Sequence, residues 1–534
     1  MKRSPIALLL SVCLCVTAVG AGCKGNNVGN DDQTLEIYVL EAGYGRDWLD
    51  ALIAEFKNQD WVQEKYPDLQ IAVPNPNREW SYAPNRIRAG ASINTSDLMF
   101  GIDLQKIYSE RDNSGKPYLA DLSDVYSSKV PGEEITFEEK MIDSFNQSSL
   151  FYDKDLQKNV RYAVTWAAGM DGILYNDAYF KEHGWALPLT TDELETLCRT
   201  IQDGNLKSEI TGNTVYPFVQ SSNTAYWRFM FPLWWAQYEG YENYQNYYRG
   251  VVNDYLDSAV VKQTGRLRSL ECIETFLSGD NRYLHENAGA LQYRDAQVRF
   301  LMGEGVFQVN GDWFNLEMAS DLEDYPAAEI KIMRTPVISS IIEKTPTIKD
   351  DAALHTVIEA VDAGQSGCDG VSEEDFAIIK EARSIVESIG PNHNAVIPDY
   401  ASAKELAKDF LRFMATDVAN EAYTRATGGA SMPFLYDVRE KAPEVYESAS
   451  DLQKTRITIY GDDNVPAKVL PSPYAFSLYT YGNLLPLTTY TDPLEFAFYN
   501  KTHTAKGIYE ADIEYWTAND NRNWNTAVSL ANLR

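Results

Sequence analysis

Histidine is scarce in this sequence, and the residues of a catalytic centre do not occur together. Only five of the 534 residues are histidines, and no two of them have the close spacing that binds one metal ion. They are His183, His285, His355, His393 and His503. No Gly-x-Ser-x-Gly segment, which would form the nucleophile elbow of a hydrolase, is present either. These absences argue against a metallohydrolase or a serine hydrolase, and we expect neither catalysis nor a cofactor.

Acidic residues are so abundant that their presence alone does not indicate a site. With 77 Asp and Glu, pairs of carboxylates are inevitable, so they give no specific support to a glycosidase. The turn at 461–464 (GDDN) is rich in Asp and Asn, but no loop has the terminal Glu of an EF-hand. Calcium therefore stays open at this turn, while a solvated surface turn is the favoured interpretation.

Positively charged residues are also fewer than negatively charged ones. The 47 Lys and Arg leave a formal net charge of −30, which a phosphate backbone would repel. Nucleic acid is therefore excluded as a partner, and a soluble, self-repelling protein is favoured, which we expect to be a monomer. The length is ample for two large lobes with separate cores.

Cysteine is rare, and its spacing indicates no disulfide framework. Three of the six cysteines lie within the first 23 residues, and the others are Cys198, Cys272 and Cys368. An odd number at wide spacing matches neither a set of disulfides nor a metal cluster. One pair could bridge in an oxidising compartment, but buried free thiols are favoured.

No long apolar run follows the N-terminus, and the one at the N-terminus is typical of a signal peptide. Lys2 and Arg3 precede an uncharged apolar run, and small residues end it. We expect residues 1–22 to be a signal peptide. The small residues before Cys23 resemble a lipoprotein processing box, which implies a lipid on Cys23, although Gly20 stands where an aliphatic residue is usual. An ordinary signal peptide with an incidental Cys is the alternative.

A polar tether and the first unit of an α/β fold follow. Residues 23–33, rich in Gly and Asn, predict a flexible lipidated tether. Residues 34–40 predict a strand, and a helix begins after a glycine-containing loop. Ligands of such folds bind at the carboxyl ends of strands. Tyr44 and Gly45, in that loop, are therefore candidate ligand-binding residues.

Further strands are predicted at 69–73 and 97–101. The loop between them is rich in Pro, Asn and Arg, and it adds Arg78 and Trp80 as candidates.

Aromatic residues are plentiful, with 34 Tyr and 11 Trp. Flat rings pack against the apolar faces of sugars, whose hydroxyls need polar partners. The most aromatic tract, 216–248, contributes Trp227 and Trp234 as candidates. Large cores use the same residues, so a buried aromatic helix is the slightly favoured interpretation of this tract.

The stretch 162–185 (YAVTWAAGMDGILYNDAYFKEHGW) organises the chain. It predicts a strand, a break at small residues, a second strand, and a helix capped by Asn176. Small residues between strands suit a hinge. The stretch resembles the hinge crossing of extracellular solute-binding proteins of ABC importers, in the sugar-binding branch (family 1). Trp166, at the break, is a candidate ligand contact.

Other segments resemble the same family in the same order. Residues 187–194 are similar to its "P-x-T-W-(D/E)-E-L" helix start, with Thr191 in place of Trp. Residues 298–313 resemble its "F-x-x-G-(K/E)-(A/G)-A-M-x-x-x-G-x-W" return crossing. Residues 402–433 resemble its helix followed by a Gly-containing loop and Pro.

The resemblance implies an α/β, two-lobed periplasmic-binding-protein-like (type II) fold. Lobe 1 would comprise 34–165 plus 311–336, and lobe 2 would comprise 166–310 plus 337–534. Three hinge crossings are expected, near Trp166, Asn310 and Pro336.

The resemblance also implies a function and further site residues. Asp312 and Trp313 would lie near the cleft, and Gly428 and Gly429 would place backbone donors on a ligand. The protein would be lipid-anchored on the extracytoplasmic face of the cell membrane. It would bind a carbohydrate, favoured as an oligosaccharide, and deliver it to the transmembrane subunits of a permease. A protein that serves a membrane sensor and a surface glycoside-active enzyme are the alternatives.

Overall fold

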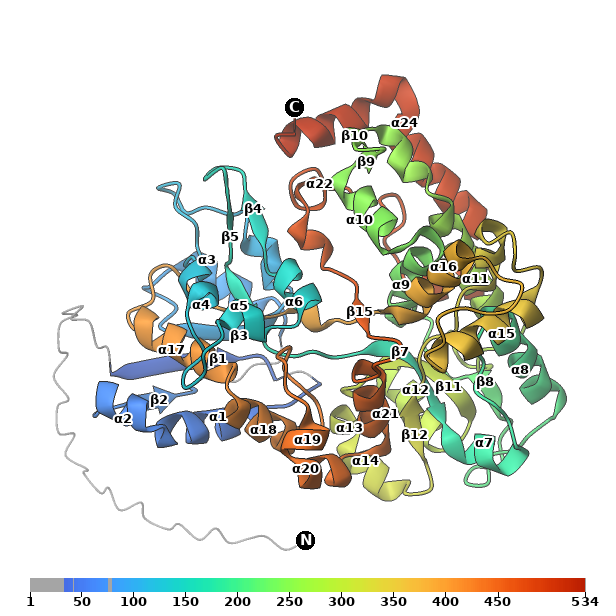
Figure 1. The fold of residues 1–534 in the computed structure, drawn as a ribbon, viewed down its shortest axis with the longest axis horizontal. Helices are drawn as coiled ribbons and strands as arrows, with labels where there is room; N and C mark the ends of the chain where they lie inside the picture. The colour runs from blue at the N-terminus through green and yellow to red at the C-terminus, as the bar shows by residue number, and fades with distance from the viewer. Residues whose placement is uncertain (1–32, 42, 75–78, 534) are drawn as a thin grey trace, which may run out of the picture.

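A computed structural model describes residues 33–41, 43–74 and 79–533 (Figure 1). Two separate sheets lie in two lobes. The first sheet has the strand order β2-β1-β3-β14-β6, in which β1 is parallel to β2 and β3, and β14 is antiparallel to β3 and β6. Its strands are β1 (Thr34–Val39), β2 (Gln70–Ala72), β3 (Leu98–Ile102), β6 (Ala163–Thr165) and β14 (His393–Val396).

The second sheet has the order β12-β7-β11-β8, and its central strand β7 is antiparallel to both neighbours. Its strands are β7 (Asp171–Asn176), β8 (Tyr216–Phe218), β11 (Gly305–Gly311) and β12 (Ile330–Ile332). β7 and β11 are buried along their whole length, as expected for strands covered on both faces. The two sheets confirm the predicted two-lobed α/β fold.

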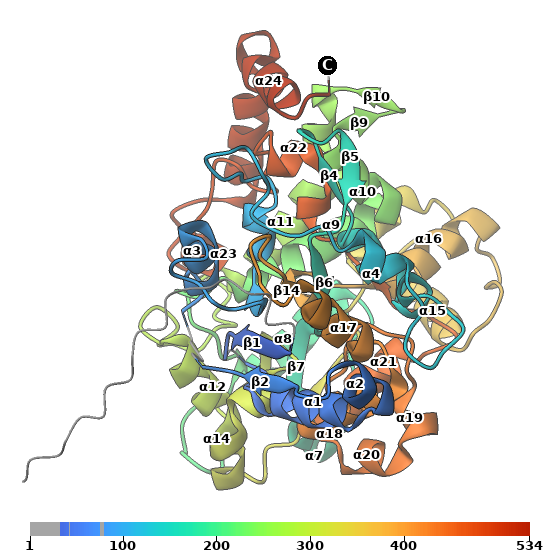
Figure 2. The same ribbon diagram turned by 90° about the vertical axis from the view of Figure 1, so that its left-hand side faces the viewer.

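Helices α1 (Asp47–Asn58), α17 (Lys404–Met414) and α18 (Asp417–Ala426) cover the first sheet. α1 buries Trp48, Leu52 and Phe56 at helical spacing, and it lies beside α18 in both views (Figures 1 and 2). The ring of Trp48 stacks on that of Trp166 at 4.6 Å. Residues from opposite ends of the chain therefore share this core.

The second lobe is mainly helical. Asn176 caps α7 (Asp177–His183), as predicted, by accepting a hydrogen bond from the Ala178 N–H, and Thr190 caps α8 (Thr191–Asp203) in the same way. α9 (Met230–Glu239), α10 (Tyr241–Arg249), α11 (Thr264–Leu277) and the long C-terminal α24 (Ala505–Leu530) pack around an aromatic core. Figure 1 shows α24 along the outer edge of this lobe.

The sequence predicted only some of the places where the chain passes from one sheet to the other. Residues 166–170 join β6 to β7, as expected for the crossing at Trp166. A second connection runs from β13 (Ile385–Val386) through 387–392 to β14, and the chain returns to β15 (Lys468–Val469), which pairs with β13. The crossing expected at Pro336 is wrong, because the Pro336 carbonyl accepts a hydrogen bond from Trp234 inside the second lobe.

The predicted lobe boundaries need two corrections that follow from strand pairing. Residues 330–332, expected in lobe 1, form β12 and pair with β7 of the second sheet. Residues 393–426, expected in lobe 2, supply β14, α17 and α18 to the first lobe. Asn310, expected at a crossing, lies within β11 of the second sheet.

Two further predictions concern the N-terminus and the cysteines. The signal peptide, Cys23 and nearly all of the tether lie outside the described residues. Within the described part of the chain, no helix is long and apolar enough to cross a membrane. Cys198, Cys272 and Cys368 are free thiols, as favoured above, and Cys198 is buried.

A buried ion pair fixes α24 on the second lobe, and its loss should destabilise the protein. Arg266 of α11 and Asp512 of α24 are both fully buried and paired, and Asp512 also accepts hydrogen bonds from the Thr488 and Thr489 N–H groups. Asp512→Ala leaves a buried guanidinium without its partner. We expect the free energy of unfolding, measured by urea denaturation, to fall by about 3–5 kcal/mol.

The exposed Glu510 on the same helix provides the control. Glu510→Ala should change stability by less than about 0.5 kcal/mol. Equal effects of the two substitutions would contradict a structural role for the pair.

Candidate functional site

A cavity of about 250 Å³ lies where the connections between the lobes meet the second lobe. The second connection forms one wall, α9 and α10 form another, and the segments at 470–473 and 485–491 complete it. Its lining includes Arg228, Phe231, Tyr244, Tyr248, Glu387, Ser388, Asn392, Ser472, Tyr479, Tyr490 and Thr491. Mostly apolar walls with a few polar groups are the usual make-up of a small-molecule site.

Tyrosine rings form much of the wall. The ring of Tyr248 meets those of Tyr244 and Tyr479 edge to face, at 5.5 and 5.9 Å. Burial raises the pKa of Tyr244 and Tyr248 well above the ordinary value, so both phenols stay protonated. The Tyr248 hydroxyl has no hydrogen-bond partner among the described residues. The wall therefore offers fixed aromatic faces and one hydroxyl, that of Tyr248, that can bond to a ligand.

Polar groups of the second connection and of the segment at 470–473 line the cavity. The Asn392 side chain accepts hydrogen bonds from Gln105 Nε2 at 3.2 Å and Ser472 Oγ at 3.4 Å, and the Asn392 carbonyl accepts one from the Asp103 N–H. Asn392 therefore joins the first lobe to the cavity wall. Arg228 donates to the carbonyls of Thr491 and Asp492.

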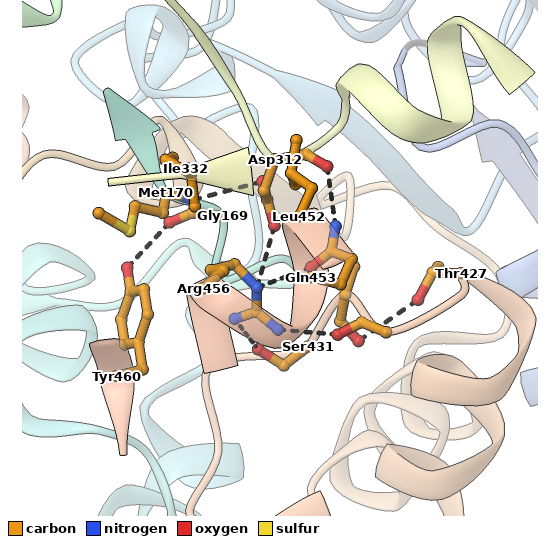
Figure 3. Close-up of polar contacts among 12 residues, drawn as sticks. Gly169, Met170, Asp312, Ile332, Thr427, Ser431, Leu452, Gln453, Arg456 and Tyr460 are labelled. Atoms are coloured by element: carbon orange, nitrogen blue, oxygen red, sulfur yellow. Dashed lines mark hydrogen bonds and ion pairs between the residues drawn. The ribbon is translucent and has the colours of Figure 1, made fainter. Parts of the chain in front are cut away.

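A polar network centred on Asp312 and Arg456 ties the two lobes together (Figure 3). Tyr44, in the loop after β1, donates a hydrogen bond to Asp312 Oδ1 at 2.7 Å, and the Met170 N–H of the first crossing donates to the same atom. Arg456 of α21 (Asp451–Tyr460) forms an ion pair with Asp312 Oδ2 at 3.3 Å. Burial raises the pKa of Asp312, and Arg456 and Tyr44 oppose this rise.

Arg456 extends the network to the predicted glycine loop. It donates to the Gly429 carbonyl at 2.8 Å and to Ser431 Oγ at 2.9 Å. Three predicted site residues, Tyr44, Asp312 and Gly429, are thus brought together, although by contacts within the protein. Gly429 also lines a second cavity of about 310 Å³ on this side.

Trp313 closes the loop against the second lobe. It is nearly buried, its ring meets that of Phe229 edge to face at 6.1 Å, and a Cβ at Gly43 would lie only 2.7 Å from its ring. Gly43 is therefore the residue that lets the two lobes meet here.

The remaining predicted residues lie elsewhere. Trp166, Trp227 and Trp234 are fully buried in the cores, which argues against the ligand contacts expected of them in this conformation. Trp80 is 52% exposed, and Gly45 and Gly428 are exposed residues with positive φ that line neither cavity. Arg78 and Cys23 lie outside the described residues.

Sequence patterns did not identify the residues that line the tyrosine-walled cavity. Tyr244 and Tyr248 belong to the aromatic tract, but only its tryptophans were chosen. Glu387 and Asn392 flank a Gly-Pro break that signals a turn between strands. That break was the available signal for the second connection.

No protein-family model matches the sequence, and no curated protein matches it. Solved structures do share the fold. A probable secreted solute-binding lipoprotein from Streptomyces coelicolor has a TM-score of 0.55 at 13% identity, over 92% of this chain and 100% of that chain. A chitin oligosaccharide binding protein has a TM-score of 0.54 at 14% identity, over 90% and 97%.

A family 1 extracellular solute-binding protein from Bifidobacterium longum subsp. infantis has a TM-score of 0.53 at 13% identity, over 92% of this chain and 99% of that chain. At such low identity the likeness shows the fold alone. The chain has the two-lobed fold of solute-binding proteins along nearly its whole described length.

The contact between Gly43 and Trp313 gives a test of how the lobes meet. In Gly43→Ala the added methyl group overlaps the Trp313 ring, so the loop must move away from the second lobe. We expect a loss of about 1–3 kcal/mol in stability and a larger radius of gyration in X-ray scattering.

Gly367→Ala is the matched control, because Gly367 is exposed and a Cβ there meets no atom within 4 Å. Its stability and scattering should equal those of the parent protein. An unchanged radius of gyration in Gly43→Ala would show that this contact does not set the distance between the lobes.

Proposed function

We propose that this protein is an extracytoplasmic solute-binding lipoprotein of an ABC importer, and that it binds a carbohydrate, favoured as an oligosaccharide, between its lobes. The observation that carries the proposal is the tyrosine-walled cavity at the junction of the connections. Rings pack on the apolar faces of sugars, while Asn392, Ser472 and Glu387 offer polar partners for hydroxyls.

The comparisons support a binding role. The similar structures named above are solute-binding proteins, and one is described as binding chitin oligosaccharides. Their fold has two lobes joined by connections, as this chain has. In such a fold a ligand that contacts both lobes shifts the population towards the closed form. A permease would recognise that form.

The same proposal covers membrane attachment. Lipid on Cys23 would hold the folded lobes near the permease through the polar tether at 23–33. A sensor in place of a permease and a glycoside-active enzyme remain the alternatives.

A thermal-shift screen tests the proposal. The soluble protein, begun after Cys23, is incubated with mono- and oligosaccharides, and each mixture is then analysed for products. A ligand that binds the folded state at a hundredfold excess over its Kd adds about 2.7 kcal/mol to stability. A shift without products supports binding, and products would support the enzyme. The absence of any shift would contradict a carbohydrate ligand.

Replacing one ring of the wall should weaken binding. Tyr479 lines the cavity and packs on Tyr248, so Tyr479→Ala removes an aromatic face from the ligand. We expect Kd, measured by titration calorimetry with a saccharide found in the screen, to rise roughly 10- to 100-fold. Tyr255→Ala is the control, because Tyr255 is 77% exposed and lies outside the cavity. Equal affinity in the two variants would place the ligand elsewhere.

The lipid anchor has its own test. In cells that express the whole chain, the parent protein should partition with membranes, and Cys23→Ser should appear in the soluble extracytoplasmic fraction. Labelling with a fatty-acid probe should mark only the parent protein. An unlabelled parent would refute the lipid on Cys23.

A further inference from the structure

Two carboxyl side chains lie side by side where the first crossing meets the second connection. Asp171, at the start of β7, and Glu387 are direct partners in an antiparallel bridge, and the Asp171 N–H donates to the Glu387 carbonyl at 3.0 Å. Side chains of directly opposed residues project from the same face of such a pair, with their Cβ atoms about 5 Å apart. The backbone therefore holds the two carboxyl groups together.

Neither carboxyl group is compensated. Asp171 is 1% exposed, and neither of its oxygens makes a hydrogen bond of normal geometry to a described residue. Glu387 Oε2 is also buried without a partner. In the part of the chain that the structure describes, no Lys, Arg or His lies within ion-pair distance of either group. Buried ions without partners are costly, so this arrangement needs a reason.

Two other buried carboxylates show the contrast, because Asp312 has Arg456 and Asp512 has Arg266. Among the described residues Glu495 also lacks a cation, but it accepts a hydrogen bond from the Trp227 N–H. Burial raises the pKa of Glu387 well above its ordinary value, and the neighbouring Asp171 raises it further. The pKa of Asp171 is also raised, by burial and by Asp312, and the nearby Ile389 N–H opposes this only in part.

Glu387 opens onto the tyrosine-walled cavity. It lines that cavity together with Tyr244 and Ser388, whereas Asp171 is not a lining residue. Arg228, the cation of the cavity lining, is held by the carbonyls of Thr491 and Asp492 and makes no ion pair with Glu387. A ligand would therefore meet an uncompensated carboxyl group next to an aromatic ring.

We propose that Glu387, with its bridge partner Asp171, forms a subsite for a positively charged amino group, so that the saccharide bound here is an amino sugar with free amines. The inference rests on the proposed function, and it specifies the class of sugar. An ammonium group supplies both the hydrogen-bond donors and the charge that the pair lacks. The adjacent Tyr244 ring also favours a cation.

A neutral sugar fits the pair less well. A hydroxyl group donates one hydrogen bond, but it leaves the two negative charges uncompensated in a buried place. The pair would then have to keep a proton in order to avoid their repulsion. An ammonium ion removes that requirement, and one ion can lie between both groups.

The experiment compares two saccharides that differ only at nitrogen. Titration calorimetry at neutral pH measures the Kd of a glucosamine tetrasaccharide and of its fully N-acetylated counterpart, with spermidine as an amine that is not a sugar. We expect the free amines to give at least about tenfold tighter binding, a difference of about 1.4 kcal/mol. Acetylation removes the charge and keeps the ring.

Two variants locate the effect. Glu387→Gln keeps the shape and removes the charge, and it should abolish the preference for the free amine while affinity for the acetylated sugar changes less than threefold. Asp171→Asn should reduce the preference in part. Glu374→Gln, on the exposed face of α16 (Glu373–Ser384), removes the same charge from the surface and should change nothing. Circular dichroism confirms that each variant is folded.

The outcomes separate this inference from the proposed function. Tight binding of neutral saccharides without a preference for the amine, or a preference that survives Glu387→Gln, overturns the amine subsite and leaves carbohydrate binding in place. Binding of spermidine that Glu387→Gln abolishes, with no saccharide bound, keeps the cationic subsite and overturns the carbohydrate. Binding of none of the three compounds overturns both.

Discussion

The buried ion pair between Asp312 and Arg456 is the interaction on which the arrangement of the lobes depends. Removing two charges from water is favourable only when each finds partners. Here Arg456 lies 3.3 Å from Asp312 Oδ2, and Oδ1 accepts hydrogen bonds from Tyr44 and Met170. Asp312 follows β11, Arg456 comes from α21, and the partners of Asp312 also include Tyr44 of the loop after β1 and the first crossing. Four segments far apart in the sequence are therefore held in one geometry.

The polar network joins the two lobes, whereas the cavity is the candidate ligand site. The cavity shares no lining residue with the network of Figure 3, yet the two are one residue apart, because Met170 contacts Asp312 and Asp171 is the bridge partner of Glu387. A change in the charge of the carboxyl pair would thus act directly on the first crossing. If the ligand binds at Glu387 as proposed, a continuous backbone segment, residues 170–171, joins its site to Asp312.

The sequence was most informative where local chemistry decides the structure. The cap at Asn176 and the small residues between β6 and β7 follow from residues that act locally. Tyr44 and Asp312 were each predicted as site residues, but the hydrogen bond between them was not. The lobe boundaries could not be read in that way. β12 and β14 are short strands whose sheet is chosen by backbone pairing with β7 and β3, and a strand of three or four residues is too short to indicate which sheet it joins. The ligand contacts predicted for Trp227 and Trp234 failed for a related reason. A tryptophan gives the same sequence pattern whether it faces a ligand or a core.

Polar groups without partners are informative because folding does not favour them. Leaving a buried donor or acceptor unpaired costs about 1–3 kcal/mol, and more for a charged group. Trp227 Nε1 and the Ser222 hydroxyl are also unpaired in the described part of the chain, but neither residue lines either of the two cavities. Glu387 and Tyr248 instead line one cavity, and Asp171 is the bridge partner of Glu387. Among the described residues, two neighbouring carboxyl groups without a cation, one of which lines the cavity where the lobes join, are an unfavourable arrangement that a bound cationic group would relieve.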